Sequence, residues 1–297
     1  MRPNIQTNLL LVLITLSLLS ASCSKKSDVI VVNPCLTSTS TSSQSAYDPV
    51  LDYLSRRSGA LVPQNVSNVP MPKSSQYETL ESFCVVSEPR NLFNGIDLQG
   101  WSNETGGSPK GWTVESGLLR LTDPENGGDL LSNESFTNFI LTFEWRFGLE
   151  CNSGIKYKIE QPNGKGWIGL EYQIQDDAHV EDGKISDRKT ASLFDVFPAK
   201  ESSKESGFPA PTEKEPNGAF RQGKIVVFGN NVEHWLDGER ALAFTIGSDE
   251  WNDAKSQSKY KNQKNFGLID SSPILLQAHG YPIDFRSITI QILTPQN

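Results

Sequence analysis

The hydrophobic pattern beyond residue 115 consists of short segments in which apolar and polar residues alternate, separated by Gly, Pro, Asn and Asp. A period of two is typical of β-strands that turn one face toward a core. Such segments cover residues 117–122, 139–147, 154–160, 169–175, 223–229, 231–238, 273–280 and 287–293. No long stretch has helical periodicity. Many short antiparallel strands therefore predict an all-β, two-sheet sandwich of the jelly-roll type.

Turn residues predict how some of these strands are connected. Residues 229–231 (Gly-Asn-Asn) and 237–238 (Asp-Gly) predict two tight turns, so that three strands form a meander. Asn94 and Gly95 suit a turn that Asp97 caps. Gly154, in Cys-Asn-Ser-Gly-Ile, predicts a hairpin turn with the glycine in the left-handed conformation.

Alternation also predicts which side chains share a face. The residues expected on the core are Phe143, Trp145, Ile155, Tyr157, Tyr172 and Ile174. The residues expected together on one exposed face are Glu144, Arg146, Lys156, Lys158, Glu171, Gln173 and Gln175. That face is either a solvated surface, with ion pairs each worth under about 1 kcal/mol, or a working site. Asp176, Asp177 and His179 cluster where the last of these strands ends, which favours function there.

The first residues predict export. Arg2 is followed by an apolar run, Leu-Leu-Leu-Val-Leu-Ile-Thr-Leu-Ser-Leu-Leu, and then by small residues before Cys23. This order resembles a bacterial lipoprotein signal, residues 1–22, that is cleaved before a lipidated Cys23. The alternative is an ordinary secretory signal cut nearby. We expect a protein held by its lipid to a bacterial membrane, in the periplasm or on the cell surface.

Composition separates a linker from a folded domain. Residues 23–87 are rich in Ser, Thr and Pro and are expected to form a tether, with a short helix at 46–61 as one option. All 6 Trp lie at or beyond Trp101, so the folded domain is expected at 88–297.

The cysteines leave two alternatives open. In an oxidising compartment Cys35 and Cys84 can form a disulfide and leave Cys151 single. Otherwise these three cysteines are free thiols.

Charge and missing motifs exclude several classes of function. The formal net charge is −8 and Lys and Arg form no cluster, which argues against nucleic-acid binding and suits a neutral ligand such as a sugar. No zinc-site spacing, nucleotide-binding Gly loop, G-x-S-x-G or H-E-x-x-H is present. The oligomeric state is not indicated.

Several motifs together resemble one known family. Between residues 91 and 294 the chain contains, in this order, LFNGIDLQGW, GLLRL, FEWRF with NSGIKYKI, EYQIQDD, SLFDVFPAK, NVEHWLDGERAL and ILLQAHGYPIDFRSI. This set resembles the 3-keto-disaccharide hydrolase family, also described as a 3-keto-glucoside lyase/2-hydroxyglucal hydratase domain. The resemblance implies a concanavalin-like jelly roll and a hydrolase or lyase acting on glycosides already oxidised at C3. It also agrees with export, because many relatives are periplasmic or surface lipoproteins.

Three positions depart from the family pattern. Residues 218–221 read Gly-Ala-Phe-Arg where Gly-Glu-Trp-Asn is usual, Ala278 replaces a frequent Asp before His-Gly, and Ser287 replaces an Asn. If that Asp binds a metal or orients the His, we expect weaker turnover, altered specificity or binding alone.

The chemistry that the resemblance implies needs a base, a positive group facing an enolate oxygen, and an acid at the leaving group. The catalytic candidates are Glu171 or His279 as base and Arg146 or Lys158 as the positive group. The substrate-binding candidates are Glu144, Asn152, Gln173 and Asp176. Asn152 and Asp176 could instead hold a divalent cation, and no other cofactor is expected. The competing hypothesis is a non-catalytic, lectin-like carbohydrate-binding module, which the same polar face would serve equally.

Overall fold

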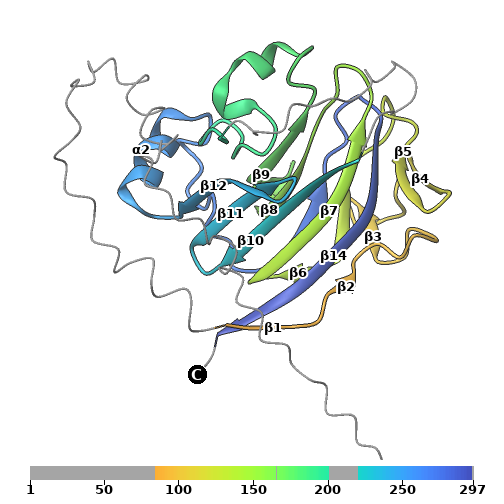
Figure 1. Ribbon diagram of the computed structural model, residues 1–297, viewed down its shortest axis with the longest axis horizontal. Helices are drawn as coiled ribbons and strands as arrows, with labels where there is room; N and C mark the ends of the chain where they lie inside the picture. Colours follow the sequence, from red (N-terminus) through yellow and green to blue (C-terminus); the bar gives the residue numbers. More distant parts are fainter. Residues whose placement is uncertain (1–83, 165, 201–219, 296–297) are drawn as a thin grey trace, which may run out of the picture.

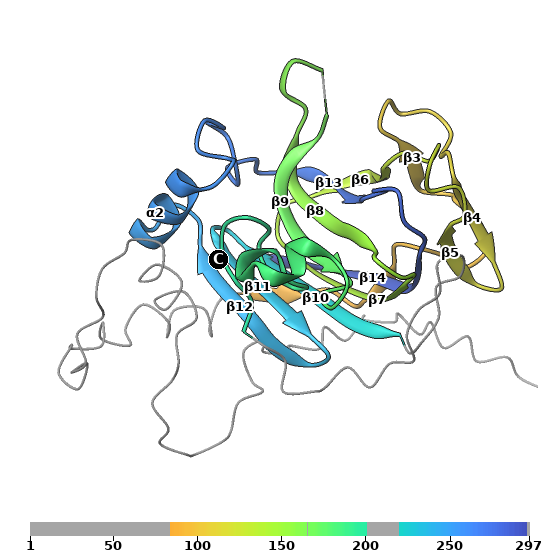
Figure 2. The same cartoon turned by 90° about the horizontal axis from the view of Figure 1, so that it is seen from above.

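The computed structural model describes residues 84–164, 166–200 and 220–295, which fold as two antiparallel β-sheets packed face to face (Figure 1). Figure 2 shows the two layers from above. This confirms the predicted all-β fold, a concanavalin-like jelly-roll sandwich. Within the described residues, no helix is long and apolar enough to span a membrane.

The large sheet has the strand order β12-β11-β10-β7-β14-β5-β4, and β1 and β2 also pair with β14. Its strands are β1 (Cys84–Val86), β2 (Arg90–Asn91), β4 (Trp112–Glu115), β5 (Leu118–Leu121), β7 (Phe139–Phe147), β10 (Arg221–Phe228), β11 (Asn231–Leu236), β12 (Glu239–Thr245) and β14 (Ile283–Pro295).

The small sheet has the order β3-β6-β13-β8-β9. Its strands are β3 (Trp101–Asn103), β6 (Leu130–Phe136), β8 (Asn152–Glu160), β9 (Ile168–Gln175) and β13 (Ser272–Leu276). The helical segments are η2 (Pro162–Gly164), η3 (Glu181–Lys184), η4 (Ser186–Arg188) and α2 (Asp249–Gln257).

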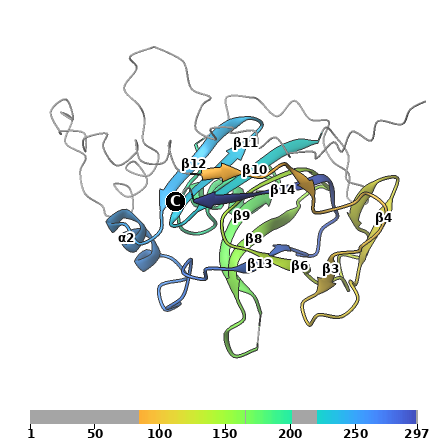
Figure 3. The same cartoon turned by 90° about the horizontal axis from the view of Figure 1, so that it is seen from below.

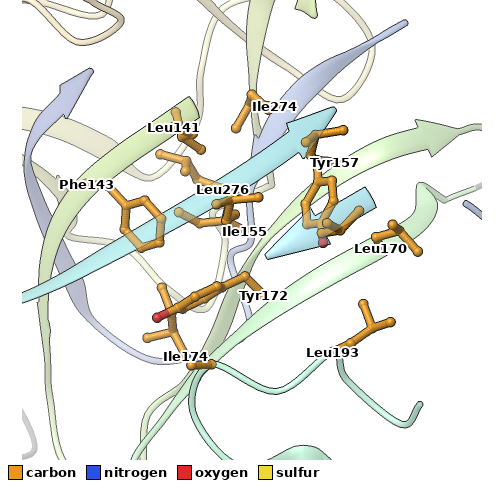
Figure 4. Packing of buried hydrophobic residues seen from close by; sticks show 14 of the residues in the cluster. Leu141, Phe143, Ile155, Tyr157, Leu170, Tyr172, Ile174, Leu193, Ile274 and Leu276 are labelled. Carbon is orange, nitrogen blue, oxygen red and sulfur yellow. The ribbon is translucent and has the colours of Figure 1, made fainter. Parts of the chain in front are cut away.

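The core lies between the sheets, and the residues that alternation assigned to it are there. Phe143, Trp145, Ile155, Tyr157, Tyr172 and Ile174 are all 0% exposed. Figure 4 shows five of these six side chains meeting from β7, β8 and β9. Burying each such side chain stabilises the fold by roughly 1.5–3 kcal/mol.

The predicted meander is confirmed as β10-β11-β12. Its turns need backbone that favours glycine or aspartate: Gly229, Asp237 and Gly238 have φ of +59°, +50° and +85°. Asn94 and Asp97 also cap their turn as expected, because Asn94 Oδ1 accepts from Asp97 N and Asp97 Oδ1 accepts from Gln99 N.

One helix has no counterpart in the sequence prediction. α2 begins after Ser248, whose side chain accepts a hydrogen bond from Trp251 N. Trp251 then stacks on Phe244 and Phe266, with ring centroids 5.6 and 5.7 Å away. This packing fixes α2 beside β12 at the end of the sandwich (Figure 3).

The N-terminal expectations stay predictions. The signal at 1–22, Cys23 and the tether up to residue 83 lie outside the described residues, and so does Cys35 of the expected disulfide. Cys151 is a free and fully buried thiol.

Candidate active site

Polar side chains gather on the face of the small sheet that is turned away from the core, here called the outer face of the small sheet. Along β9, Tyr172 and Ile174 enter the core, so the residues that alternate with them project from this outer face. These residues are Glu171, Gln173 and Gln175, and they are 5%, 0% and 1% exposed. A charged residue and two amides so deeply buried need partners around them.

The neighbouring strands supply those partners in register. On β8, Lys156 faces Glu171, Gly154 faces Gln173, and Asn152 faces Gln175. On β13, Leu275 faces Lys156. Gln277, directly after this strand, takes the next outward position, and its N–H donates to the Gly154 carbonyl at 2.9 Å. Three strands thus bring a carboxylate, an ammonium and four amides onto one surface.

Glu171 and Lys156 form the charged pair of this surface, with Lys156 Nζ 3.7 Å from Glu171 Oε2. Gly154 gives the Glu171 carboxylate its room, because a Cβ at Gly154 would lie 2.9 Å from Glu171 Oε1. The expectation of a left-handed turn at Gly154 is therefore wrong. This glycine lies within β8, and close approach to a side chain accounts for it better than turn geometry does.

The amides form a connected group beside Glu171. With its nitrogen toward β8 and Glu171, the Gln173 amide donates to Glu171 Oε1 at 3.1 Å and to the Ser153 carbonyl at 3.3 Å, and its oxygen faces the amides of Gln175 and Asn152 at 2.9 and 3.1 Å. Gln277 Oε1 is buried and accepts no hydrogen bond from the described residues. Such an acceptor is suited to a ligand hydroxyl, because buried polar atoms are normally paired.

A second carboxyl group approaches from the start of β6. Asp129 Oδ1 accepts a hydrogen bond from Ala278 N at 2.9 Å. Burial raises the pKa of Asp129; this hydrogen bond and Lys156 oppose the rise, while Glu104 and Glu171 add to it. Asp129 therefore keeps its proton to higher pH than an ordinary aspartate, beside a carboxylate paired with lysine.

Residues 188–197 border the surface on the open edge of β9. Phe194 N donates to the Glu171 carbonyl at 3.1 Å, which ties this segment to β9. Lys259 Nζ lies 4.1 Å from the centre of the Phe194 ring. Burial lowers the pKa of Lys259, whereas Glu171 and Asp195 raise it. Lys259 is therefore a second positive charge, in addition to Lys156, that interacts with Glu171.

The structure brings together some of the site residues proposed from the sequence. Glu171, Gln173 and Asn152 share the outer face of the small sheet. His279 is exposed two residues after Gln277, in the connection from β13 to β14, at the border of this face. Sequence reasoning missed Asp129, Gln277 and Lys259 as site residues, and it counted Lys156 as a face residue only.

Two of the site residues proposed from the sequence, Asp176 and Lys158, make hydrogen bonds that stabilise the local structure. Asp176 Oδ2 accepts from Glu150 N at 3.1 Å and lies 2.8 Å from His179 Nδ1, so this carboxylate organises the turn after β9. Lys158 sits at an irregularity of β8 with φ of +48°, and its Nζ donates to the Ile269 carbonyl at 3.1 Å. Burial lowers the pKa of Lys158.

Glu144 and Arg146 lie on the opposite side of the molecule. They belong to β7 in the large sheet and alternate with Phe143 and Trp145 of the core, so they point away from the small sheet. Arg146 donates to the buried Asp284, and Glu144 accepts two hydrogen bonds from Arg286 at 3.1 Å. The expectation that Glu144 and Arg146 share one face with Glu171 is therefore wrong, since β7 belongs to the large sheet and β9, which carries Glu171, to the small sheet.

The donor set does not fit a divalent cation. Within residues 84–164, 166–200 and 220–295, no group of three or more His, Cys, Asp or Glu is arranged to hold a metal. The Asp176 carboxylate, proposed as a ligand together with Asn152, is already used by Glu150 and His179.

Comparison with known proteins gives the family. Residues 88–291 match the 3-keto-alpha-glucoside-1,2-lyase-like domain. The chain belongs to this family. A 3-keto-disaccharide hydrolase from Bacteroides thetaiotaomicron is 28% identical over 234 residues, which are 68% of this chain and 77% of that protein.

Solved structures similar to this 3-keto-alpha-glucoside-1,2-lyase-like domain include two candidate glycosyl hydrolases from Parabacteroides distasonis. One is 25% identical with a TM-score of 0.58, over 75% of this chain and 97% of the other. The second is 20% identical with a TM-score of 0.54, over 68% and 98% of the two chains, and shares the fold alone.

The structure shows the local surroundings of Ala278, Arg221 and Ser287, three positions that depart from the family pattern. Ala278 contributes its backbone N–H to Asp129 and needs no side chain for this contact. Arg221 donates to Asp237 Oδ2 at 2.7 Å across the β10–β11 hairpin. Ser287 has φ of +50° at an irregularity of β14, a backbone conformation that Asn adopts more readily than Ser.

Proposed function

We propose that the protein is a carbohydrate-active enzyme that cleaves 3-keto-glycosides or 3-keto-disaccharides, by elimination across C1–C2 followed by hydration. The observation that supports this most is the convergence of Glu171, Lys156 and Asp129 on the outer face of the small sheet. The family match and the similarity to a named 3-keto-disaccharide hydrolase give this charge group its substrate class.

Glu171 is the base of the proposed reaction. A carbonyl at C3 makes the C2–H acidic, and Glu171 takes that proton while the electron pair forms an enolate. Positive charge must then face the enolate oxygen. Two lysines are placed to supply this charge. Lys156 Nζ lies 3.7 Å from Glu171 Oε2, and Lys259, which lies over the Phe194 ring, interacts electrostatically with Glu171.

Asp129 is the acid of the proposed reaction. Its raised pKa suits a group that carries a proton to the leaving oxygen as the C1–O bond breaks. Water then adds to C1 of the resulting 2-hydroxyglucal and a proton returns to C2, so the net reaction is hydrolysis. Gln277 and Asn152 are placed to bind hydroxyl groups of the sugar.

Export to a bacterial membrane is part of the proposal. The apolar segment before Cys23 and the Ser/Thr-rich region after it support a lipoprotein that works in the periplasm or on the cell surface.

The test compares purified protein acting on 3-keto-glucosides and on the matching unoxidised glucosides, with release of the aglycone as the measurement. We expect release from the oxidised substrates alone. Reaction in deuterium oxide should place deuterium at C2, and product without deuterium at C2 would indicate direct displacement at C1. Binding of both sugars without turnover of either would favour the lectin-like alternative.

A further inference from the structure

The outer face of the small sheet has an apolar end beside its charged groups. Leu131, Ile159 and Leu275 form a hydrophobic cluster that is separate from the main core. Leu130 and Leu276 enter the main core, so their chain neighbours Leu131 and Leu275 project from the outer face. This surface is therefore not polar throughout.

The strand register sets the cluster directly beside the charged groups. Leu275 of β13 lies opposite Leu131 of β6 on one side and opposite Lys156 of β8 on the other. Lys156 in turn faces Glu171. Leu131 follows Asp129 by two residues, so the two side chains point to the same side of the sheet. Lys156 and Asp129 therefore border the cluster, and Glu171 lies one strand further.

Trp167 covers this apolar end. It precedes β9 and packs against the cluster, and Leu131, Ile159 and Leu275 are 5%, 2% and 0% exposed. The indole is itself only partly buried, so part of its ring is open to a ligand. Its Nε1 is buried and has no acceptor among the described residues, so packing rather than a hydrogen bond holds the ring. Trp167 is thus an aromatic surface, fixed from below, at the border of the site.

The amides lie at the other end of the same face. Asn152 faces Gln175 at one end of the β8–β9 pair, whereas Ile159 and Trp167 lie toward the hairpin at the other end. The charged groups lie between the two. A sugar ring with several hydroxyl groups suits the amide end, because buried hydroxyl groups need hydrogen-bond partners. Aliphatic side chains offer a hydroxyl group no hydrogen bond, so a second sugar at the apolar end would lose its bonds to water without replacement.

We propose that this apolar end, Leu131, Ile159, Leu275 and Trp167, is the subsite for the leaving group, and that it takes an alcohol with a flat apolar ring stacked on Trp167. The inference rests on the proposed function, in which Asp129 protonates the oxygen that leaves C1. The 3-keto-glucosyl ring then occupies the amide end, the cleaved bond lies at the charged groups, and the alcohol is released from the apolar end. An aromatic leaving group is therefore favoured over a second sugar.

The test uses 3-keto-glucosides that differ in the leaving group alone: methanol, benzyl alcohol or a second glucose. The kcat/KM of each variant is divided by that of wild type for the same substrate, which cancels the different acidities of the leaving groups. Trp167→Leu keeps an apolar contact with the cluster but has no ring. Its kcat/KM should fall about tenfold with the benzyl substrate, the size of one lost aromatic contact. It should stay close to wild type with the methyl substrate, and fall less with the disaccharide than with the benzyl substrate.

Two further variants separate stacking from folding. Trp167→Phe keeps an aromatic ring and should retain more of the benzyl activity than Trp167→Leu does. Trp235→Leu removes a partly buried tryptophan of β11 in the large sheet, and it should match wild type with all three substrates.

Binding gives a readout that needs no turnover. In the Glu171→Gln protein, calorimetry should show that the benzyl 3-keto-glucoside binds more tightly than the methyl one. Adding Trp167→Leu should remove this difference, because the ring then has nothing to stack on.

Equal losses with the methyl and benzyl substrates in Trp167→Leu would overturn the inference, because the effect would then not depend on the leaving group. An unchanged rate with the benzyl substrate would also overturn it, and so would a larger loss with the disaccharide, which would assign the subsite to a sugar. Absence of turnover by the wild-type protein would contradict the proposed function instead. The difference in binding between the benzyl and methyl compounds would then still decide whether Trp167 holds an apolar ring.

Discussion

Lys156 and Glu171 occupy directly opposed positions on β8 and β9, with Lys156 Nζ 3.7 Å from Glu171 Oε2. Their side chains are 14% and 5% exposed. Removing both charges from water offsets most of their attraction, so such a pair adds little net stability. A chemical role therefore explains this buried pair better than a contribution to folding does.

Glu171→Gln tests that role. The amide keeps the shape of the side chain but cannot accept the C2 proton, so turnover of a 3-keto-glucoside should fall on the order of a hundredfold or more. Thermal unfolding should still be cooperative. Turnover within a few-fold of wild type would remove Glu171 from the reaction.

Arg146→Met separates the two outer faces of the sandwich. Arg146 Nη2 lies 2.8 Å from Asp284 Oδ2, and Asp284 is 1% exposed. Because Arg120 alone among the ion-pair partners seen in the described residues would then remain with this buried carboxylate, the free energy of unfolding in urea should fall by about 1–3 kcal/mol. Turnover should stay close to that of wild type. A large loss of turnover in a folded Arg146→Met variant would show that the face of the large sheet takes part in the reaction.

Alternation along the strands was enough to predict which side chains enter the core, but not which sheet a strand joins. β7 and β8 follow one another in the chain and both alternate, yet β7 pairs with β10 and β14 whereas β8 pairs with β9 and β13. Both sheets carry a polar outer face, so the pattern alone could not separate Arg146 from Glu171.

The residues that sequence reasoning missed reach the site through tertiary packing. Asp129 stands before β6, whose sequence Leu-Leu-Ser-Asn-Glu-Ser-Phe has no clear alternation. Lys259 follows a helix that is held by stacking of Trp251. No sequence pattern near Asp129 or Lys259 relates either residue to Glu171. Lys156 differs from them: alternation with Ile155 and Tyr157 already placed it on the face of Glu171, and only its role in the site was not assigned.

Gly154→Ala tests the room that the Glu171 carboxylate needs. The new Cβ would lie 2.9 Å from Glu171 Oε1 and 3.1 Å from the Tyr172 carbonyl, so the carboxylate must move. Turnover should fall by at least about tenfold, since small displacements of a catalytic group are costly. Gly169→Ala is the control, because the atoms nearest to its Cβ belong to Ile159 and Tyr157, the first of them at 2.6 Å. Both variants should melt at lower temperature. Equal loss of turnover in the two would attribute the effect of Gly154→Ala to destabilisation alone.

Cys23→Ser tests anchoring. Without the sulfur no lipid can be attached, so the protein should move from the membrane pellet to the soluble fraction, as measured by immunoblotting after a high-salt wash. The wild-type protein should stay in the pellet under the same wash and leave it in detergent. Retention of Cys23→Ser in the pellet would contradict lipidation at this residue.

His234 makes stability depend on pH. It is 0% exposed, its Nε2 lies 2.7 Å from Tyr157 Oη, and its Nδ1 lies 2.9 Å from the Ala191 carbonyl. Burial lowers the pKa of His234 to about 4. The unfolded chain, with a histidine pKa near 6.5, binds more protons between these values, so stability falls as pH drops through this window and is unaffected above it. Urea unfolding near pH 7 and pH 4.5 should show that His234→Phe, although less stable at neutral pH, loses about 2–3 kcal/mol less on acidification than wild type. His279→Gln, at an exposed histidine, should follow the wild-type curve. Parallel pH dependences for His234→Phe and wild type would rule out the buried neutral imidazole as a source of acid sensitivity.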